Sequence, residues 1–255
     1  GRGACDAKGI LAAQVVAVDR LRRAGETRVG LLFVVGEERG SDGAKAANDA
    51  GPQAVSDAAR TCRYLVDGEP TESRLGLATR GMLRVKLHAS GRAAHSSFPE
   101  LGESAIDTLI DALVELRTMT LPQDPVLGQT HYTVGVIAGG VAANVVSPSA
   151  EAEVMFRTVG DAALVRAAIA PLERRVRIEH VFEVPPVRLT TVPGFDTAVF
   201  PFTTDVPLLE RWGQPLLFGP GSIHVAHTAD EYVSIAALRA AVEHYVTIAR
   251  ALLAL

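Results

Sequence analysis

The chain has few of the residues on which several classes of protein depend. Its two cysteines, Cys5 and Cys62, are too few for a disulfide framework and have no metal-site or redox spacing. No apolar run reaches the roughly 18 residues that a transmembrane helix needs. The net charge is -4 and the longest basic runs are two Arg-Arg pairs, which argues against a nucleic-acid partner. We therefore expect a cytoplasmic protein without a membrane or nucleic-acid partner, with a lost N-terminal signal left open.

The most informative motif that is present is a pair of adjacent carboxylates. Glu37 and Glu38 follow the apolar run of residues 31–35 in LLFVVGEERGSDG. Successive side chains of a strand point to opposite faces, so one carboxylate can bind a metal ion while the other transfers protons. The ordinary alternative is a solvated turn, because exposed Glu pairs are common.

Three further motifs favour a metal site. Asp6 lies in the Gly-flanked loop GRGACDAKG, Glu69 lies in GEPT after an expected strand, and His227 lies in AHTADEY before the last expected helix. Asp67 is an alternative to Glu69, and His224 is an alternative to His227. Carboxylate oxygens and imidazole nitrogens are the ligands that catalytic zinc sites use.

Together these motifs resemble the M20 family of zinc-dependent peptidases and deacylases, which includes acetylornithine deacetylase, succinyl-diaminopimelate desuccinylase and glutamate carboxypeptidase. The resemblance implies two Zn²⁺ ions, with one ion or substitution by Co²⁺ or Mn²⁺ as alternatives. It implies that Asp6 bridges the two ions and that Glu38, Glu69 and His227 are further ligands. Glu37 is then the catalytic base, which takes a proton from water and passes it to the leaving amine. No Ser nucleophile is needed, and the sequence has no G-x-S-x-G turn.

One feature departs from the family pattern. The family places a His-x-Asp motif on an upstream strand, and this chain starts too late to contain it, without an initial Met. We expect a truncated, cleaved or incomplete polypeptide in which Asp6, Glu38 and His227 hold one zinc ion. The second ion, held by Asp6 and Glu69, would lack its imidazole. A non-catalytic fragment is therefore the alternative to an active enzyme.

The pattern of apolar residues predicts two interleaved domains. Helices and strands alternate at first, as in an α/β sheet: helix 9–24, buried strand 29–36, helix 42–50 and strand 62–67. From Gly81 the pattern becomes β-α-β-β-α-β: strand 82–91, helix 103–119, strands 131–140 and 150–158, helix 161–174 and strand 176–184. A last helix follows at 231–253. We expect a zinc-peptidase-like catalytic α/β domain, residues 1–79 and 188–255, with an inserted ferredoxin-like α+β domain at 80–187.

In the family the inserted domain is a lid that also forms a homodimer, and three of its residues match substrate contacts. His95 matches a histidine that steadies the oxyanion, often in the partner subunit's site. Asn144 and Arg157 match residues that bind polar and carboxylate groups of the substrate. The ordinary alternatives are a structural histidine and an exposed arginine. The other histidines are interpreted as structural: His88, His131, His180 and His244.

The sequence therefore predicts zinc-dependent hydrolysis of an amide bond in an N-acyl amino acid or small peptide, as in a deacetylase or desuccinylase. Carboxypeptidase and aminopeptidase activities of the same family are the alternatives. The acyl group and the amino acid are not determined by the sequence, because specificity depends on the shape of the pocket.

Overall fold

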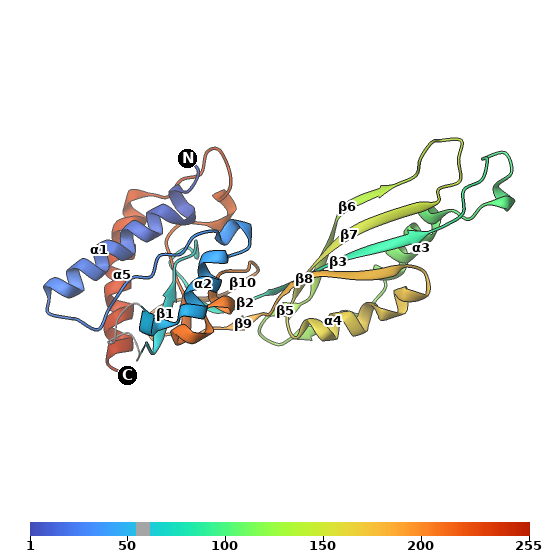
Figure 1. Ribbon diagram of the computed structural model, residues 1–255. Helices are drawn as coiled ribbons and strands as arrows, with labels where there is room; N and C mark the ends of the chain where they lie inside the picture. Colours follow the sequence, from blue (N-terminus) through green and yellow to red (C-terminus); the bar gives the residue numbers. More distant parts are fainter. Residues whose placement is uncertain (55–61) are drawn as a thin grey trace. The chain divides into compact units, whose positions relative to one another are not determined.

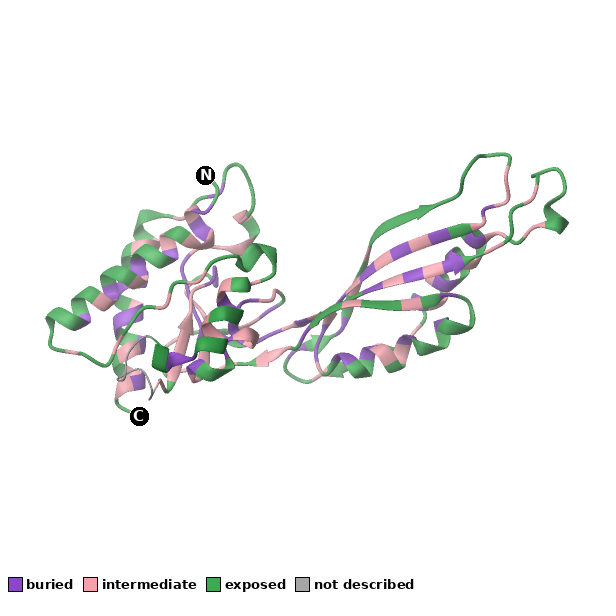
Figure 2. Cartoon of the chain, in the orientation of Figure 1, coloured by how far each residue is buried: buried purple, intermediate pink, exposed green. Residues whose placement is uncertain are grey.

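The computed structural model describes residues 1–54 and 62–255. The chain divides into two compact units, each with its own set of buried residues (Figure 1, Figure 2). Unit 1 comprises residues 1–79, 187–200 and 204–255, and unit 2 comprises residues 80–186 and 201–203. Unit 1 is an α/β unit and unit 2 is an inserted α+β unit, as the sequence predicts for the fold class. Val187, expected in the inserted unit, lies in unit 1.

In its described residues, unit 1 has three helices of eight or more residues and five short strands. Strands β1 and β11 pair in parallel, and β2 lies between β10, which is parallel to it, and β9, which is antiparallel. The bounds are α1 Ile10–Arg23, α2 Asp42–Ala50, β1 Tyr64–Asp67, β2 Leu75–Thr79, β9 Val187–Arg188, β10 Thr197–Phe200, β11 Gln214–Leu217 and α5 Ile235–Leu253.

The β1–β11 pair has apolar residues packed on both faces. Tyr64 and Val66 pack against the core formed by α1 and α5, whereas Leu65 packs against a smaller core that contains Ala44 of α2 and Trp212. This alternation is the expected period of two for a strand. Strand β1 therefore lies between the two cores, and its C-terminal end is at Asp67.

Residues 29–36, expected as a buried strand, form no strand in the structure. Leu32 packs against the smaller core, but Phe33 is 56% exposed and Val35 is 76% exposed. Residues 29–34 make no backbone hydrogen bond with other described residues, and a strand is defined by such pairing. The segment is therefore extended with alternating burial, but it lacks a neighbour to complete a ladder.

Unit 2 has the strand order β6-β7-β3-β8, with all neighbours antiparallel. Helices α3 and α4 contribute buried residues to one core with β3 and β7, so both helices cover the same face of the sheet. The bounds are β3 Gly81–Ser90, α3 Ala105–Leu116, β4 Gln123–Asp124, β5 Gly128–Gln129, β6 His131–Gly139, β7 Ser149–Thr158, α4 Ala162–Ile169 and β8 Arg177–Val184.

The helix ends follow local capping. Ser104 and Asp161 accept hydrogen bonds from the N–H groups of residues at the starts of α3 and α4. Helix α4 is shorter than expected, because a 3-10 turn, Ala170–Arg174, begins before Pro171. Helix α5 begins at Ile235 after the N-cap Ser234, not at residue 231. Among the described residues, no helix is both long and apolar enough to cross a membrane.

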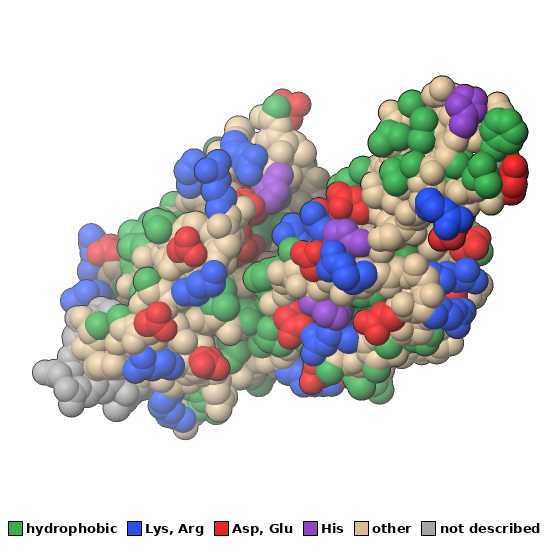
Figure 3. All heavy atoms as spheres, turned by 45° about the vertical axis from the view of Figure 1, so that its right-hand side comes forward, with side chains coloured by type: hydrophobic (Ala, Val, Ile, Leu, Met, Phe, Trp, Pro, Cys, Tyr) green, Lys and Arg blue, Asp and Glu red, His purple; other side chains and the backbone are tan. Residues whose placement is uncertain are grey.

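The face of the unit 2 sheet opposite the helices carries charged side chains. Lys86 forms an ion pair with Glu153 at 3.1 Å, and His88 lies between Glu151 and Glu179 at 3.5 and 2.9 Å. In the view of Figure 3, acidic, basic and histidine side chains are intermixed on one side of the molecule. Opposite charges on neighbouring strands stabilise this open face.

Candidate metal centre

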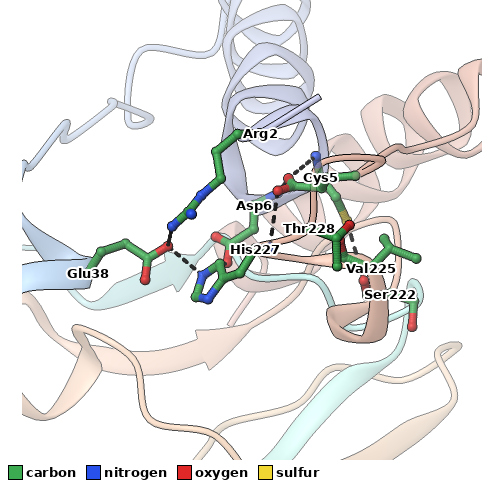
Figure 4. A network of polar contacts seen from close by, with 9 residues as sticks. Arg2, Cys5, Asp6, Glu38, Ser222, Val225, His227 and Thr228 are labelled. Atoms are coloured by element: carbon green, nitrogen blue, oxygen red, sulfur yellow. Dashed lines mark hydrogen bonds and ion pairs between the residues drawn. The ribbon is translucent and has the colours of Figure 1, made fainter.

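Three side chains from distant parts of unit 1 meet at one point (Figure 4). Nε2 of His227 lies 3.4 Å from Oδ2 of Asp6 and 2.5 Å from Oε1 of Glu38. One ligand atom of each residue lies within 4.8 Å of the others. Arg2 lies on the outer side of the group, with Nη2 3.7 Å from Oε1 of Glu38. The structure thus brings together three of the four expected metal ligands.

The chemistry of this group suits a zinc ion. Catalytic zinc sites use three N or O ligands from the protein and leave a position for water or substrate. Partial burial raises the pKa of Asp6, and the nearby charge of Glu38 raises it further, while His227 lowers it. A cation would remove the unfavourable proximity of the two carboxylates. His227, and not His224, is the imidazole that meets these carboxylates in the structure.

The backbone around the three ligands is held by a residue to which the sequence reasoning gave no role. The buried carboxylate of Glu231 accepts hydrogen bonds from the N–H groups of Cys5 and Asp6, both at 2.8 Å, and of His227 at 3.2 Å. These backbone donors lower the pKa of Glu231 to about 2. The available signal was proximity in the sequence, because Glu231 follows His227 by four residues in AHTADEY.

The same hydrogen bond supports an uncommon backbone conformation. His227 has φ +64°, in the left-handed region that non-glycine residues rarely adopt. Such a residue costs roughly 1 to 3 kcal/mol and persists only where its surroundings determine it. The N–H group of His227 is fixed by Glu231, so the position of the imidazole depends on this contact.

Glu37 and Glu38 have different surroundings. Both lie in the 3-10 turn Glu37–Arg39 rather than on a strand, so alternation along a strand is not what separates them. The side chain of Glu37 as a whole is exposed, but its carboxyl group is partly buried. This burial, followed by the negative charges of Asp205 and Glu38, raises the pKa of Glu37 to about 7. Glu37 therefore lies among acidic groups but outside the group of three ligands.

A second set of acidic groups lies at the end of β1. Glu69 and Asp205 are buried, and Oδ2 of Asp67 and Oδ1 of Asp205 are buried oxygens without a hydrogen-bond partner among the described residues. Burial and the charge of Asp67 raise the pKa of Glu69 well above its ordinary value. Buried unpaired carboxylates are costly, so these oxygens also suit a cation. Both Glu69 and Asp67 remain candidates for the ligand, and Asp205 was not anticipated from the sequence.

Two of the three expected substrate contacts lie on neighbouring loops of unit 2. His95 forms an antiparallel bridge with Val145, and the N–H group of Ser96 donates to the carbonyl oxygen of Asn144 at 3.0 Å. The N–H group of Ser97 donates to Nδ1 of His95 at 3.1 Å. Since Nδ1 accepts this hydrogen bond, the ring proton of the neutral imidazole is on Nε2. The exposed side of His95 is then a hydrogen-bond donor.

Arg157 lies at the opposite end of β7 from these loops. Its backbone pairs with Met82 and His131, whereas the loop of Asn144 joins β7 at Ser149. At about 3.3 Å per residue along a strand, the two ends are roughly 26 Å apart. Partial burial lowers the pKa of Arg157, and no ion pair to it is found in the described part of the chain. The structure therefore does not bring Arg157 to His95.

The family follows from comparison with known sequences. The model of peptidase family M20/M25/M40 matches residues 1–251. The chain belongs to this family. It is 38% identical over 246 residues to a peptidase M20 domain-containing protein of Schizosaccharomyces pombe, covering 93% of this chain and 60% of that protein. It is 38% identical over 280 residues to a probable carboxypeptidase of Aspergillus clavatus, covering 99% of this chain and 62% of that protein.

A solved structure shows the same fold. The aminopeptidase PepT of Bacillus cereus has a TM-score of 0.73 with 18% sequence identity, over 94% of this chain and 69% of that chain. The chain spans about three fifths of the length of the two sequence relatives, from Schizosaccharomyces pombe and Aspergillus clavatus.

Proposed function

We propose that this protein hydrolyses the amide bond of a small peptide or an N-acyl amino acid that has a free carboxylate, with zinc as its metal. The observation that carries the proposal is the meeting of Asp6, Glu38 and His227, with Glu37 beside them but not among them. Relatives at 38% identity that include a probable carboxypeptidase support a peptide substrate. Deacetylase and desuccinylase activities are the narrower alternatives.

Each residue of the centre has a separate role in this proposal. Asp6, Glu38 and His227 would hold one ion, and Asp6 with Glu69 or Asp67 would hold a second. When bound, zinc supplies the positive charge that polarises a carbonyl group and favours ionisation of water. Glu37 accepts the proton of the attacking water and donates it to the leaving amine. Burial, the largest cause, raises the pKa of Glu37 above its ordinary value, and a general base works best with a pKa near the working pH.

In the proposed homodimer, each active site receives Arg157 from one chain and His95 from the other. Arg157 binds the carboxylate of the substrate, since a partly buried guanidinium without an ion pair is suited to bidentate recognition. His95 donates Nε2–H to the oxyanion. A dipeptide is about 7 Å long, so it cannot span the roughly 26 Å between the two ends of β7. His95 and Arg157 of one chain therefore do not reach the same substrate, and in the proposed homodimer His95 serves the site of the partner subunit.

An apolar surface of unit 2 suits this dimer. Strand β6 is at the edge of the sheet, and its Val136 is 52% exposed. On α3, Ile106, Ile110 and Val114 recur every four residues and are 36%, 51% and 54% exposed. An edge strand next to an exposed apolar stripe favours pairing with a second copy, and two-fold dimers are the commonest assembly.

The test is metal analysis together with a hydrolysis screen of dipeptides and of N-acetyl and N-succinyl amino acids. We expect zinc to co-purify with the protein and turnover to require it. Glu37→Gln should lose turnover and keep the metal. A protein that binds no zinc, or a Glu37→Gln variant with full turnover, would refute the proposal.

A further inference from the structure

Unit 1 contains a hollow that shares no residue with the metal centre. Its volume is about 350 Å³. The lining comes from the turn before β10, the turn before β2 and the C-terminal half of α5: Ser73, Pro193, Gly194, Phe195, Asp196, His244 and Thr247. This volume lies at the lower end of the range found for small-molecule sites, which begins at roughly 300 Å³.

The walls of this pocket are tied to one another. The N–H group of Leu75 donates to the carbonyl oxygen of Asp196 at 2.9 Å, and the N–H group of Ser73 donates to that of Gly219 at 2.9 Å. His244 and Thr247 lie one turn apart on α5. The shape of the pocket is therefore fixed by secondary structure and backbone hydrogen bonds, without a ligand.

His244 is held in place by aromatic contacts rather than by hydrogen bonds. Its ring lies edge-on to Phe195 and Phe218, with centroids 5.6 and 5.7 Å away. Nδ1 of His244 is buried without a hydrogen-bond partner among the described residues. An N–H at Nδ1 would be a buried unpaired donor, so the ring proton is better placed on Nε2. The aromatic contacts give this part of the pocket an apolar wall.

The polar groups of the pocket are mainly oxygens. Asp196 is its only carboxylate, neither Lys nor Arg lines it, and no ion pair to Asp196 is found in the described residues. Ser73 contributes a hydroxyl group, and Thr247 Oγ1 donates to the carbonyl oxygen of Glu243 at 2.9 Å, which leaves its lone pairs free to accept. A primary ammonium group has three N–H donors, which match one carboxylate and two hydroxyl oxygens.

We propose that this pocket binds a small primary amine, with the ammonium group on Asp196 and the apolar part of the ligand against Phe195. An aromatic ring beside a carboxylate adds a cation–π contribution to the charge–charge attraction. The volume limits the ligand to about the size of an amino acid or an aromatic monoamine. The site is separate from the proposed hydrolysis and does not require metal.

The test is a titration of the 255-residue protein with benzylamine in EDTA, followed by amide chemical shifts. We expect shifts at Gly194 and Thr247, and binding about tenfold weaker in Asp196→Asn, because a hydrogen bond to a charged group is lost. Benzyl alcohol, which has the same shape without the charge, should also bind more weakly. Glu210→Gln, at an exposed carboxylate elsewhere in unit 1, is the matched control and should bind as the wild type does.

Three results would each overturn the proposal. The first is equal affinity of benzylamine for the wild type and for folded Asp196→Asn. The second is the absence of shifts around Gly194 up to tens of millimolar ligand, and the third is the appearance of shifts only around Asp6. Because EDTA removes metal, failure of the hydrolysis proposal leaves this measurement unaffected.

Discussion

Oε1 of Glu231 accepts a hydrogen bond from the backbone N–H of Asp6 at 2.8 Å. This contact joins the N-terminal segment to the segment before α5, next to the metal centre. The same carboxylate accepts the N–H of His227, so one buried residue fixes the backbone of two expected ligands. Residues that hold ligands in place commonly affect metal affinity nearly as strongly as the ligands do.

The first prediction is that Glu231→Gln weakens both folding and metal binding. The side-chain amide of the variant presents either an NH₂ group or a weaker, neutral acceptor to the three backbone N–H donors. Hydrogen bonds to a charged acceptor contribute about 2 kcal/mol each. We expect a loss of at least about 2 kcal/mol in the free energy of unfolding and about tenfold or more in zinc affinity. Urea unfolding and zinc titration measure the two effects, with Glu210→Gln as the control.

The pH dependence of this effect has a definite sign. The pKa of Glu231 is about 2 in the folded protein and lower than its ordinary value of 4.5. The stabilisation is therefore fully present above pH 4.5 and is lost as the pH falls towards 2. The difference in unfolding free energy between wild type and Glu231→Gln should shrink over that range. A difference that stays constant from neutral pH to pH 3 would contradict the assignment.

The second prediction separates the adjacent glutamates. Glu37→Gln should lower turnover by about 10² to 10⁴ and leave zinc content nearly unchanged. Glu38→Ala should lower zinc occupancy first, because Glu38 contacts His227 within the ligand group. Metal analysis and turnover measured on the same samples decide between them. Loss of zinc in Glu37→Gln would mean that the two roles are exchanged.

The third prediction concerns the metal-free protein. The folded pKa of Glu37 is about 7, above its ordinary value of 4.5. The corresponding stability is fully present below pH 4.5 and is lost as the pH rises through 7. In EDTA, the unfolding free energy of the wild type should fall between pH 5 and 8, and that of Glu37→Gln should fall less. Parallel profiles for the two proteins would contradict the raised pKa.

Much of the architecture could be predicted from the sequence, because the periodic spacing of apolar residues is a property of each local segment. Helix α2 has the predicted bounds, and the β-α-β-β-α-β order of unit 2 is found with ends shifted by a few residues. The exception is the segment 29–36, whose pattern is strand-like but whose pairing depends on a neighbour. Local sequence predicts an extended backbone, whereas a ladder is a property of two segments.

The candidate site was accessible only in part. The motifs of Asp6, Glu38 and His227 each resemble a motif of the M20 family, and the fold brings the three residues together. Asp205 lies in TTDVPLL, which carries no such resemblance, and its proximity to Asp67 arises from the tertiary structure. Long-range contacts of this kind cannot be read from a single sequence.

The fourth prediction is that the protein is a dimer in which His95 acts on the partner's site. Ile110→Lys and Val136→Lys should shift light scattering from dimer to monomer, whereas Leu164→Lys, at an exposed residue of α4, should not. A wild type that is monomeric at about 10 µM with full activity would exclude the shared site.

Mixing two inactive variants tests the shared site directly. In a mixed dimer of Glu37→Gln and His95→Ala, one of the two sites has an intact Glu37 from one subunit and an intact His95 from the other. A 1:1 mixture should therefore regain roughly a quarter of wild-type activity, because about half of the dimers are mixed and each has one complete site. Glu37→Gln mixed with Glu38→Ala is the matched control, because both residues lie in the same turn of one chain, and it should regain none. Recovery in both mixtures, or in neither, would contradict the arrangement.

The last prediction concerns residues 29–36. Their backbone N–H and C=O groups at 29–34 are unpaired with other described residues, and Phe33 and Val35 expose apolar side chains on the same segment. An extended segment with free hydrogen-bonding groups and an apolar face is a template for pairing with another strand. We therefore expect the 255-residue protein to be prone to aggregation, and the amides of Leu31 and Phe33 to exchange rapidly with solvent.

A substitution tests this directly. The double variant Phe33→Lys and Val35→Lys should raise the soluble fraction without lowering the unfolding midpoint, because neither side chain is buried. Val126→Lys, at an exposed residue of unit 2, is the control and should have little effect. Slow exchange at Leu31 and Phe33 in the monomeric 255-residue protein would show that the segment is already paired, and the explanation for its exposed apolar face would then be wrong.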